Sequence, residues 1–277
     1  LLETFLAKEA SRGLSADEQS RLIGGLDELV AGFAAEQAVT KSEGHTISVT
    51  ADAIVKLFRC TALGRALCGV GSSSAVSDDA FHAFLVDSEE TTGPELMDRW
   101  IKSQASMDMF AALPDLCMQA TGRMADRVAD GAIWVLGAEH PRVAFGLTQA
   151  GGNRAIVPVK RSVWANLSDL KEAPALVMLP NVLEWLNDDE VTDLLISLRA
   201  RLVSGGGIVM STLSPSQEAS FFAAVFGWKV YRRSPSELES LLASSDLEVL
   251  LELPSPESGT VVVLKGRGDP LTVDHLS

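Results

Sequence analysis

The sequence is poor in the residues that build disulfide frameworks and metal sites. Its 277 residues include only three cysteines, Cys60, Cys68 and Cys117, and four histidines. The cysteines are odd in number, lie among apolar neighbours and lack the spacing of metal ligands, so we expect buried thiols in a reducing compartment. The histidines, at positions 45, 82, 140 and 275, are too scattered to predict a metal site.

Basic residues and long apolar runs are also scarce. Lys and Arg total 23 against 37 Asp and Glu, a net charge of −14, which disfavours nucleic acid and anionic membrane surfaces as partners. No apolar run reaches the length of a membrane span, and the N-terminus has no basic segment ahead of an apolar one. We therefore expect a cytoplasmic protein that acts on a small molecule or another protein.

Apolar residues, in contrast, make up 47% of the chain, enough for a full hydrophobic core. Residues 1–110 are helical by pattern. Ser15 and Glu18 form a capping box, and another helix is expected after Gly93-Pro94. Behind the capping box, one helical face carries the apolar side chains of Leu22, Leu26, Leu29, Val30 and Phe33.

From about Ala111 onward, short apolar runs alternate with helical segments, the pattern of a doubly wound α/β sheet. The last two runs flank residues 254–259, which are too few for a crossover helix, so they predict an antiparallel hairpin at the end of a mostly parallel sheet. Residues 111–277 are predicted to form this domain. The apolar runs are Ile133–Gly137, Ala155–Val159, Ala175–Leu179, Ile208–Leu213, Leu247–Leu253 and Thr260–Lys265.

Helix starts between the runs are marked by capping residues with an acidic or amide partner three positions on. Asn187 is followed by Glu190, and Ser234-Pro235 by Glu237. A third start is predicted at Ser214-Pro215, with Gln217 as its partner. Next to the second of these starts, Arg232-Arg233 is interpreted as a solvated pair; alternatively it meets an acidic partner.

The stretch Ala175–Leu213 reads as strand, loop, helix, Ser204-Gly-Gly-Gly207 and strand, which is a βαβ unit. It resembles the late core of class I S-adenosylmethionine-dependent methyltransferases, and the terminal hairpin agrees with that family rather than with nicotinamide-binding Rossmann domains. The resemblance implies methyl transfer from S-adenosylmethionine to a small-molecule or carrier-bound acceptor. Residues 1–110 would then be a lid or a dimerisation region, through which a homodimer could form.

The resemblance also implies a glycine-rich turn that follows the first strand and lies against the methionine part of the cofactor. The segment Asp115–Gly122 is the best match. It keeps Asp115, Thr121 and Gly122, whereas Gln119 and its two preceding residues replace the expected glycines, so the motif is degenerate. The alternative is that the segment is only a polar turn before a helix.

Further cofactor contacts follow the later strands. Glu139 comes after Ile133–Gly137, interpreted as the second strand, and matches the acidic residue that binds the ribose hydroxyls; alternatively it favours the start of the next helix. His140 beside it is a candidate substrate contact or a structural residue. After the third strand, Lys160 and Arg161 replace the family's polar residues, and Ser162 is the candidate contact to adenine.

The loop after the fourth strand supplies the remaining candidates. Asn181 is the expected polar contact to the cofactor, and Glu184 is the carboxylate there that could act as a base. Alternatively, Glu184 is solvated.

Two functions remain open. The first is an active methyltransferase, which needs little chemistry from its protein because the cofactor is already activated. The second is a pseudo-methyltransferase that has lost the cofactor and serves as a structural or binding module, or supports other chemistry in the old cleft. A nicotinamide-dependent oxidoreductase is disfavoured, because the Gly-x-Gly-x-x-Gly turn is absent.

Overall fold

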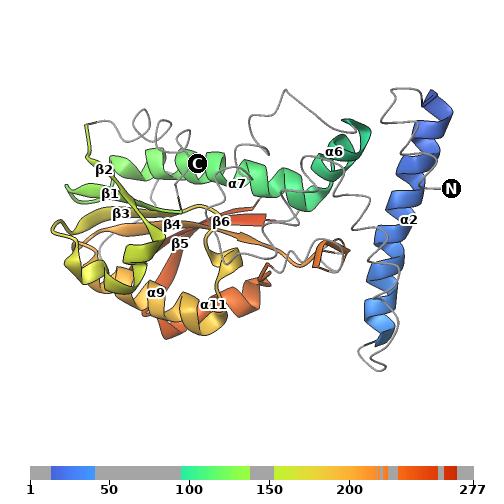
Figure 1. Cartoon of the computed structure of the whole chain (residues 1–277). Coiled ribbons are helices and arrows are strands. Elements are labelled where there is room, and N and C mark those ends of the chain that lie inside the picture. Colours follow the sequence, from blue (N-terminus) through green and yellow to red (C-terminus); the bar gives the residue numbers. More distant parts are fainter. Residues whose placement is uncertain are drawn as a thin grey trace. The chain divides into compact units, whose positions relative to one another are not determined.

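The computed structural model describes residues 14–40, 95–137, 153–216, 218, 221–223, 230–254 and 259–266 (Figure 1). The chain divides into two compact units. The first comprises residues 1–108 and 216–230, and the second comprises residues 109–215 and 231–277.

In the first unit, helix α2 (Ala16–Thr40) begins at the predicted capping box. The Ser15 N–H donates to the Glu18 carboxylate at 3.0 Å, and the Glu18 N–H donates to Ser15 Oγ at 3.3 Å. Of the predicted apolar face, Leu22, Leu26 and Val30 are buried and Leu29 is half-buried, in agreement with the helical spacing, while the side chain of Phe33 lies outside the described part of the chain.

Helix α6 (Glu95–Lys102) confirms the helix expected after Gly93-Pro94, and its Trp100 is buried in the first unit. The Trp100 indole N–H donates to Asp27 Oδ1 on α2 at 2.8 Å. The indole also meets the ring of Phe221 edge to face, with 5.8 Å between centroids. Trp100 therefore ties α6 to α2 and to the segment after residue 215.

The second unit is built on a sheet of six strands in the order β2-β1-β3-β4-β6-β5. The first four strands along the chain are parallel, and β6 is antiparallel to both of its neighbours. All six predicted runs are strands, and the predicted hairpin is confirmed. The strands are β1 (Ala132–Leu136), β2 (Ile156–Val159), β3 (Pro174–Leu179), β4 (Gly207–Leu213), β5 (Leu247–Pro254) and β6 (Gly259–Gly266).

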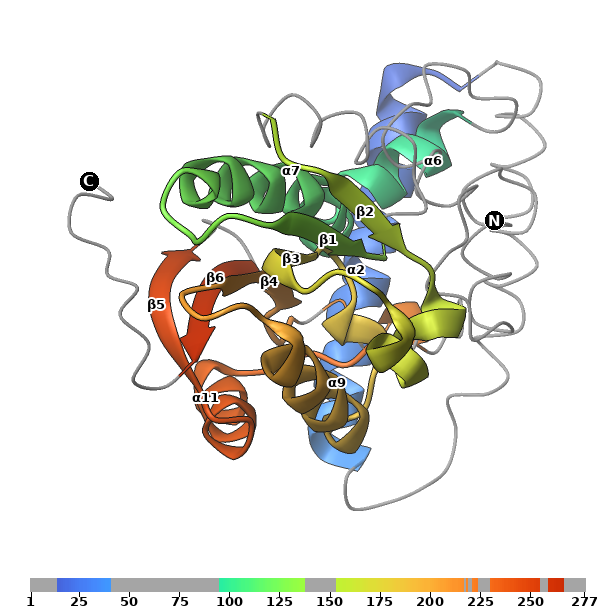
Figure 2. The same cartoon turned by 90° about the vertical axis from the view of Figure 1, so that its left-hand side faces the viewer.

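Helices cover both faces of this sheet (Figures 1 and 2). Helix α7 (Ala105–Ala125) lies on one face, and α9 (Asp188–Arg201) and α11 (Pro235–Ser244) lie on the other. Every residue of β1, β3 and β4 is buried, as expected for parallel strands between two helical layers.

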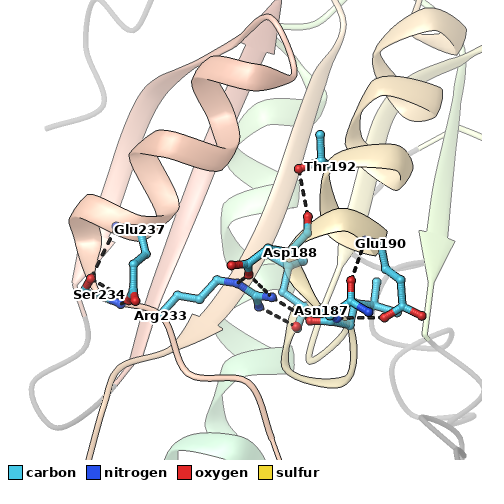
Figure 3. Close-up of polar contacts among 9 residues, drawn as sticks. Asn187, Asp188, Glu190, Thr192, Arg233, Ser234 and Glu237 are labelled. Carbon is cyan, nitrogen blue, oxygen red and sulfur yellow. Dashed lines mark hydrogen bonds and ion pairs between the residues drawn. The ribbon is translucent and has the colours of Figure 1, made fainter.

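The helix starts of α9 and α11 are capping boxes, as predicted (Figure 3). Asn187 Oδ1 accepts the Glu190 N–H at 2.9 Å, and the Asn187 N–H donates to the Glu190 carboxylate at 2.8 Å. Ser234 and Glu237 form the same reciprocal pair. The start predicted at Ser214-Pro215 depends on Gln217, which lies outside the described residues.

The strand order places a topological switch point between β1 and β3. From β1 the chain moves to β2 on one side, then crosses back to β3 on the other side. In open α/β sheets, ligands bind at the carboxyl ends of the strands beside such a switch point. This position therefore locates the candidate site.

The predicted turn at Asp115–Gly122 is wrong, because the whole segment lies within α7. The helix continues through Pro114, and its buried side chains, Leu113, Cys117, Ala120 and Met124, recur with helical spacing. Packing of this face outweighs the breaking tendency of Pro114 and Gly122. In the described part of the sheet no strand precedes β1, so Ile133–Gly137 is its first strand and not its second.

Candidate functional site

Gly137, directly after β1, brings the ends of two neighbouring strands close together. Its φ is +76°, a left-handed conformation that favours glycine. A Cβ at this position would lie 2.7 Å from Val182 Cγ2 and 3.3 Å from the Pro180 carbonyl oxygen. The backbone at the end of β1 thus packs directly against the turn after β3, and this contact leaves no room for a side chain at position 137. The sequence analysis does not predict Gly137 as a site residue, and the signal that marks it is a glycine at the end of an apolar run.

Asn181 occupies the turn after β3 and also has a left-handed backbone, with φ +52°. Asparagine tolerates this conformation better than most residues. The Asn181 N–H donates to Ser211 Oγ of β4 at 2.8 Å, and the whole residue is 1% exposed. A hydroxyl from the neighbouring strand therefore holds the unusual backbone of the turn.

Glu184 lies in the short 3₁₀ helix η2 (Leu183–Trp185), and the alternative that it is solvated is wrong, because it is fully buried. Within the described part of the chain no well-aligned hydrogen bond reaches either carboxylate oxygen. Burial raises the pKa of Glu184 to about 7. The backbone N–H of Glu184 itself and the charges of Arg233 and Arg232 oppose this rise. Glu184 is therefore poised to exchange a proton near neutral pH.

Cys117 of α7 lies near Glu184 and Ser211. Its thiol is buried and hydrogen-bonds the Ser211 side chain. Burial raises the pKa of this thiol well above its usual range, and the nearby Glu184 charge raises it further. Cys117 is therefore a protonated packing residue, as predicted for the cysteines, while Ser211 contacts both Cys117 and Asn181.

Arg233 is buried, so the interpretation of Arg232-Arg233 as a solvated pair is wrong for this residue. Its guanidinium donates to the carbonyl oxygens of Leu183 at 2.7 Å and Leu186 at 2.6 Å, and it pairs with Asp188 Oδ1 at 2.9 Å. Figure 3 shows its side chain reaching from the start of α11 towards the start of α9. Short sequence patterns gave no signal for these contacts, which join residues about 50 positions apart.

The structure brings together only part of the predicted cofactor site. Asn181 and Glu184 lie on the same turn, at the switch point. On α7, Asp115 and Gln119 are exposed, Thr121 is buried, and Gly122 is a helical residue. Ser162 lies in η1 (Arg161–Asp169), the 3₁₀ segment after β2. Glu139 and His140 lie outside the described residues.

Lys160, directly after β2, is exposed. In dinucleotide-binding sheets an acidic residue near this point binds the ribose, so the sequence departs from that pattern here. Over the described ranges no group of three or more His, Cys, Asp or Glu residues could hold a metal ion. None of the helices that the structure describes combines the length and apolarity that a membrane crossing requires.

A separate cavity of about 340 Å³ lies within the first unit. Its lining combines two carboxylates, one amide and one hydroxyl with the apolar side chains of Val30 and Ala31. Asp27 there already accepts the Trp100 indole N–H, so that carboxylate also has a structural role. The lining residues are Asp27, Val30, Ala31, Gln104, Ser216 and Glu218.

No protein-family model matches the sequence, and no curated protein matches it significantly. Among solved structures, a possible exported protein from Bordetella parapertussis is similar, with a TM-score of 0.56, 13% identity, and coverage of 92% of this chain and 100% of that one. A DUF574 family protein from Streptomyces avermitilis has a TM-score of 0.50 and 14% identity, with 71% and 99% covered.

OxaC, solved in complex with SAH and oxaline, is also similar, with a TM-score of 0.46 and 10% identity over 64% of this chain. The chain spans little more than half of the length of OxaC, 54%, and of the pyocyanin biosynthetic protein PhzM, 57%. At these identities the likeness extends to the fold alone, which in this chain is a mixed sheet of six strands with helices on both faces.

Proposed function

We propose that the second unit binds S-adenosylmethionine at the switch point and that the protein transfers its methyl group to a small-molecule or carrier-bound acceptor. The observation that carries this proposal is the position of Gly137 directly after β1, packed against the turn after β3 that carries Asn181 and Glu184. A sheet with these strand ends at its switch point and an antiparallel hairpin at its far edge supports the methyltransferase function that the sequence resembles.

The residues at the switch point fit such a cofactor. The turn at Gly137 directly follows β1 at the switch point, where ligands bind in open α/β sheets. The cofactor carries a positive sulfonium, and its binding would be favoured by the Glu184 carboxylate and by the net charge of −14. When bound, it supplies an activated methyl group, so the protein's task is to align the acceptor.

Within this proposal, Glu184 takes the proton from the acceptor. A base is most effective when its pKa lies near the working pH, and the pKa of Glu184 is about 7. Asn181 contacts the cofactor from the turn after β3. His140 is retained as a candidate contact to the acceptor, and residues 1–110 as the lid or dimerisation region. The ribose assignment of Glu139 is withdrawn, because the strand before Glu139 is the first in the described part of the sheet and the family's acidic residue follows the second.

Calorimetry with S-adenosylhomocysteine on two matched variants tests the proposal. Gly137→Ala and Gly205→Ala each place a Cβ on a left-handed backbone, with φ +76° and +75°, at a similar cost of roughly 1–2 kcal/mol. Only at Gly137 does the Cβ meet neighbouring atoms; at Gly205, in the turn before β4, it meets open space. We expect Gly137→Ala to weaken binding at least about tenfold, equivalent to about 1.4 kcal/mol, and Gly205→Ala to leave it unchanged.

Two results would contradict the proposal. If the wild-type protein shows neither heat nor thermal shift at millimolar S-adenosylmethionine or S-adenosylhomocysteine, the cofactor assignment fails. If ligand binds equally to the wild type and to Gly137→Ala, the site lies elsewhere.

The pseudo-methyltransferase is the second candidate, and a specific observation favours it. The expected glycine-rich segment is part of α7, and exposed Lys160 follows β2 where an acidic residue would hold the ribose. Absence of binding in the same calorimetric experiment is the result that this alternative expects.

A further inference from the structure

The segment Tyr231–Arg233 lies across the turn that carries Glu184. The Tyr231 N–H donates to the Glu184 carbonyl oxygen at 2.7 Å, and the Arg233 N–H donates to the Leu213 carbonyl oxygen at the end of β4 at 3.0 Å. Two backbone hydrogen bonds therefore connect this segment to η2 and to β4. They hold its backbone in place beside the candidate site.

The Arg233 side chain then holds the turn at both ends. Its Nη1 and Nη2 atoms donate to the carbonyl oxygens of Leu183 and Leu186, and its Nε donates to Asp188 Oδ1 at 3.0 Å. Leu183 and Leu186 flank Glu184 in the sequence, and the Leu186 N–H itself donates to Leu183 O. A planar guanidinium presents donors in the fixed directions that these three contacts need, whereas a lysine ammonium cannot reach all three acceptors at once.

The contacts of Arg233 are made by a buried side chain. Arg233 is 4% exposed, and Asp188, which neutralises it, stands at the exposed start of α9. The groups that face Glu184 come from three directions: Cys117 on α7, Arg232 and Arg233 beside the turn, and the backbone at the end of β4. The position of the carboxylate relative to these groups depends on the conformation of η2.

We infer that Arg233 is a positioning residue, which fixes the η2 turn and thereby sets where the Glu184 carboxylate lies at the carboxyl ends of β3 and β4. The inference rests on the proposed function, in which Glu184 is the base. Arg233 acts through Leu183, Leu186 and the turn between them, so its contribution is to hold the base in one orientation.

The test is a pH titration of Glu184 by NMR in protein labelled with ¹³C at the glutamate carboxyl carbon, without cofactor. Glu184→Gln assigns the signal. Two variants are compared with the wild type. Arg233→Met removes both the charge and the guanidinium that makes the three hydrogen bonds, and Arg233→Lys keeps only the charge. The matched control is Arg154→Met, because Arg154 also donates to backbone carbonyls, those of Val128 and Ala129, at the amino end of β1.

In Arg233→Met we expect the Glu184 pKa to rise by about one unit, because an adjacent opposite charge is removed. In both Arg233 variants the amide of Tyr231 should exchange with solvent at least about tenfold faster than in the wild type, because the turn opens locally. Arg154→Met should change neither quantity. If Arg233→Met fails to fold, the Tyr231 amide in Arg233→Lys carries the same test.

The inference is overturned if the Glu184 pKa and the Tyr231 exchange rate in the Arg233 variants equal those in Arg154→Met. Since no cofactor is present, this result is independent of the proposed function. Wild-type protein that binds S-adenosylhomocysteine while the Arg233 variants behave like the control would refute the positioning role alone. Protein that binds no ligand while the variants shift Glu184 would refute the proposed function alone.

Discussion

Replacement of Glu184 by glutamine should change how the stability of the protein depends on pH. Glu184 is fully buried, and its pKa is raised from 4.5 to about 7, chiefly by burial. A folded-state pKa above the unfolded value means that the folded state binds the proton more tightly. The contribution of protonated Glu184 to the free energy of unfolding is therefore fully present below pH 4.5 and is lost as the pH rises through about 7.

The magnitude follows from the two pKa values. A difference of about 2.5 units at 1.36 kcal/mol per unit gives a destabilisation of about 3 kcal/mol once Glu184 is ionised. Most of it, about 2.5 kcal/mol, develops between pH 5 and pH 8. Glutamine has nearly the same shape but cannot ionise, so Glu184→Gln should lack this loss and be more stable than the wild type at pH 8.

Urea unfolding at pH 5 and pH 8 measures the effect as the difference between wild type and variant. Glu237→Gln is a matched control: the Ser234 side chain lowers the pKa of Glu237, so its contribution is present above pH 4.5 and is lost only in more acidic solution. That control should keep the wild-type pH dependence. If Glu184→Gln and the wild type lose equal stability from pH 5 to pH 8, Glu184 is not a buried group that titrates near neutrality.

Two further predictions concern groups around the site. In a Cys60→Ser, Cys68→Ser protein, Cys117 should react with iodoacetamide at least about 100-fold more slowly than in urea, because burial raises its pKa and blocks access; similar rates would place the thiol at the surface. Asn187→Ala should lower the free energy of unfolding by about 1 kcal/mol through loss of the α9 capping box, whereas Ser197→Ala, which removes an exposed bond to Asp193 O within the same helix, should change it by less than about 0.5 kcal/mol.

The features that were predicted correctly depend on neighbours a few residues apart. A capping box needs only the pair Asn187 and Glu190, and a buried strand such as β3 needs only a short apolar run between turn residues. The hairpin of β5 and β6 followed from the few residues between them, too few for a helix. Because these patterns involve only residues close together in the sequence, they can be identified without knowledge of the tertiary structure.

The turn predicted at Asp115–Gly122 failed because the match rested on three residues, Asp115, Thr121 and Gly122, and not on the pattern of burial along the segment. In α7 the buried side chains of Leu113, Cys117 and Met124 pack on the sheet, and that burial outweighs a proline in the helix. With this segment taken as the first turn, Ile133–Gly137 becomes the second strand, and the prediction places no glycine turn at Gly137.

By itself, the sequence determined the alternation of strands and helices, their starts, and the hairpin, because these follow from hydrophobic period and capping chemistry over a few residues. Only the tertiary structure decided which side chains form the site. Burial of Glu184 raises its pKa, whereas the backbone of Leu213 on β4 and the charge of Arg233 before α11 oppose this rise, and Cys117 on α7 lies nearby. Burial and electrostatic environment are sums over neighbours in space, and these neighbours lie up to 67 positions away in the chain.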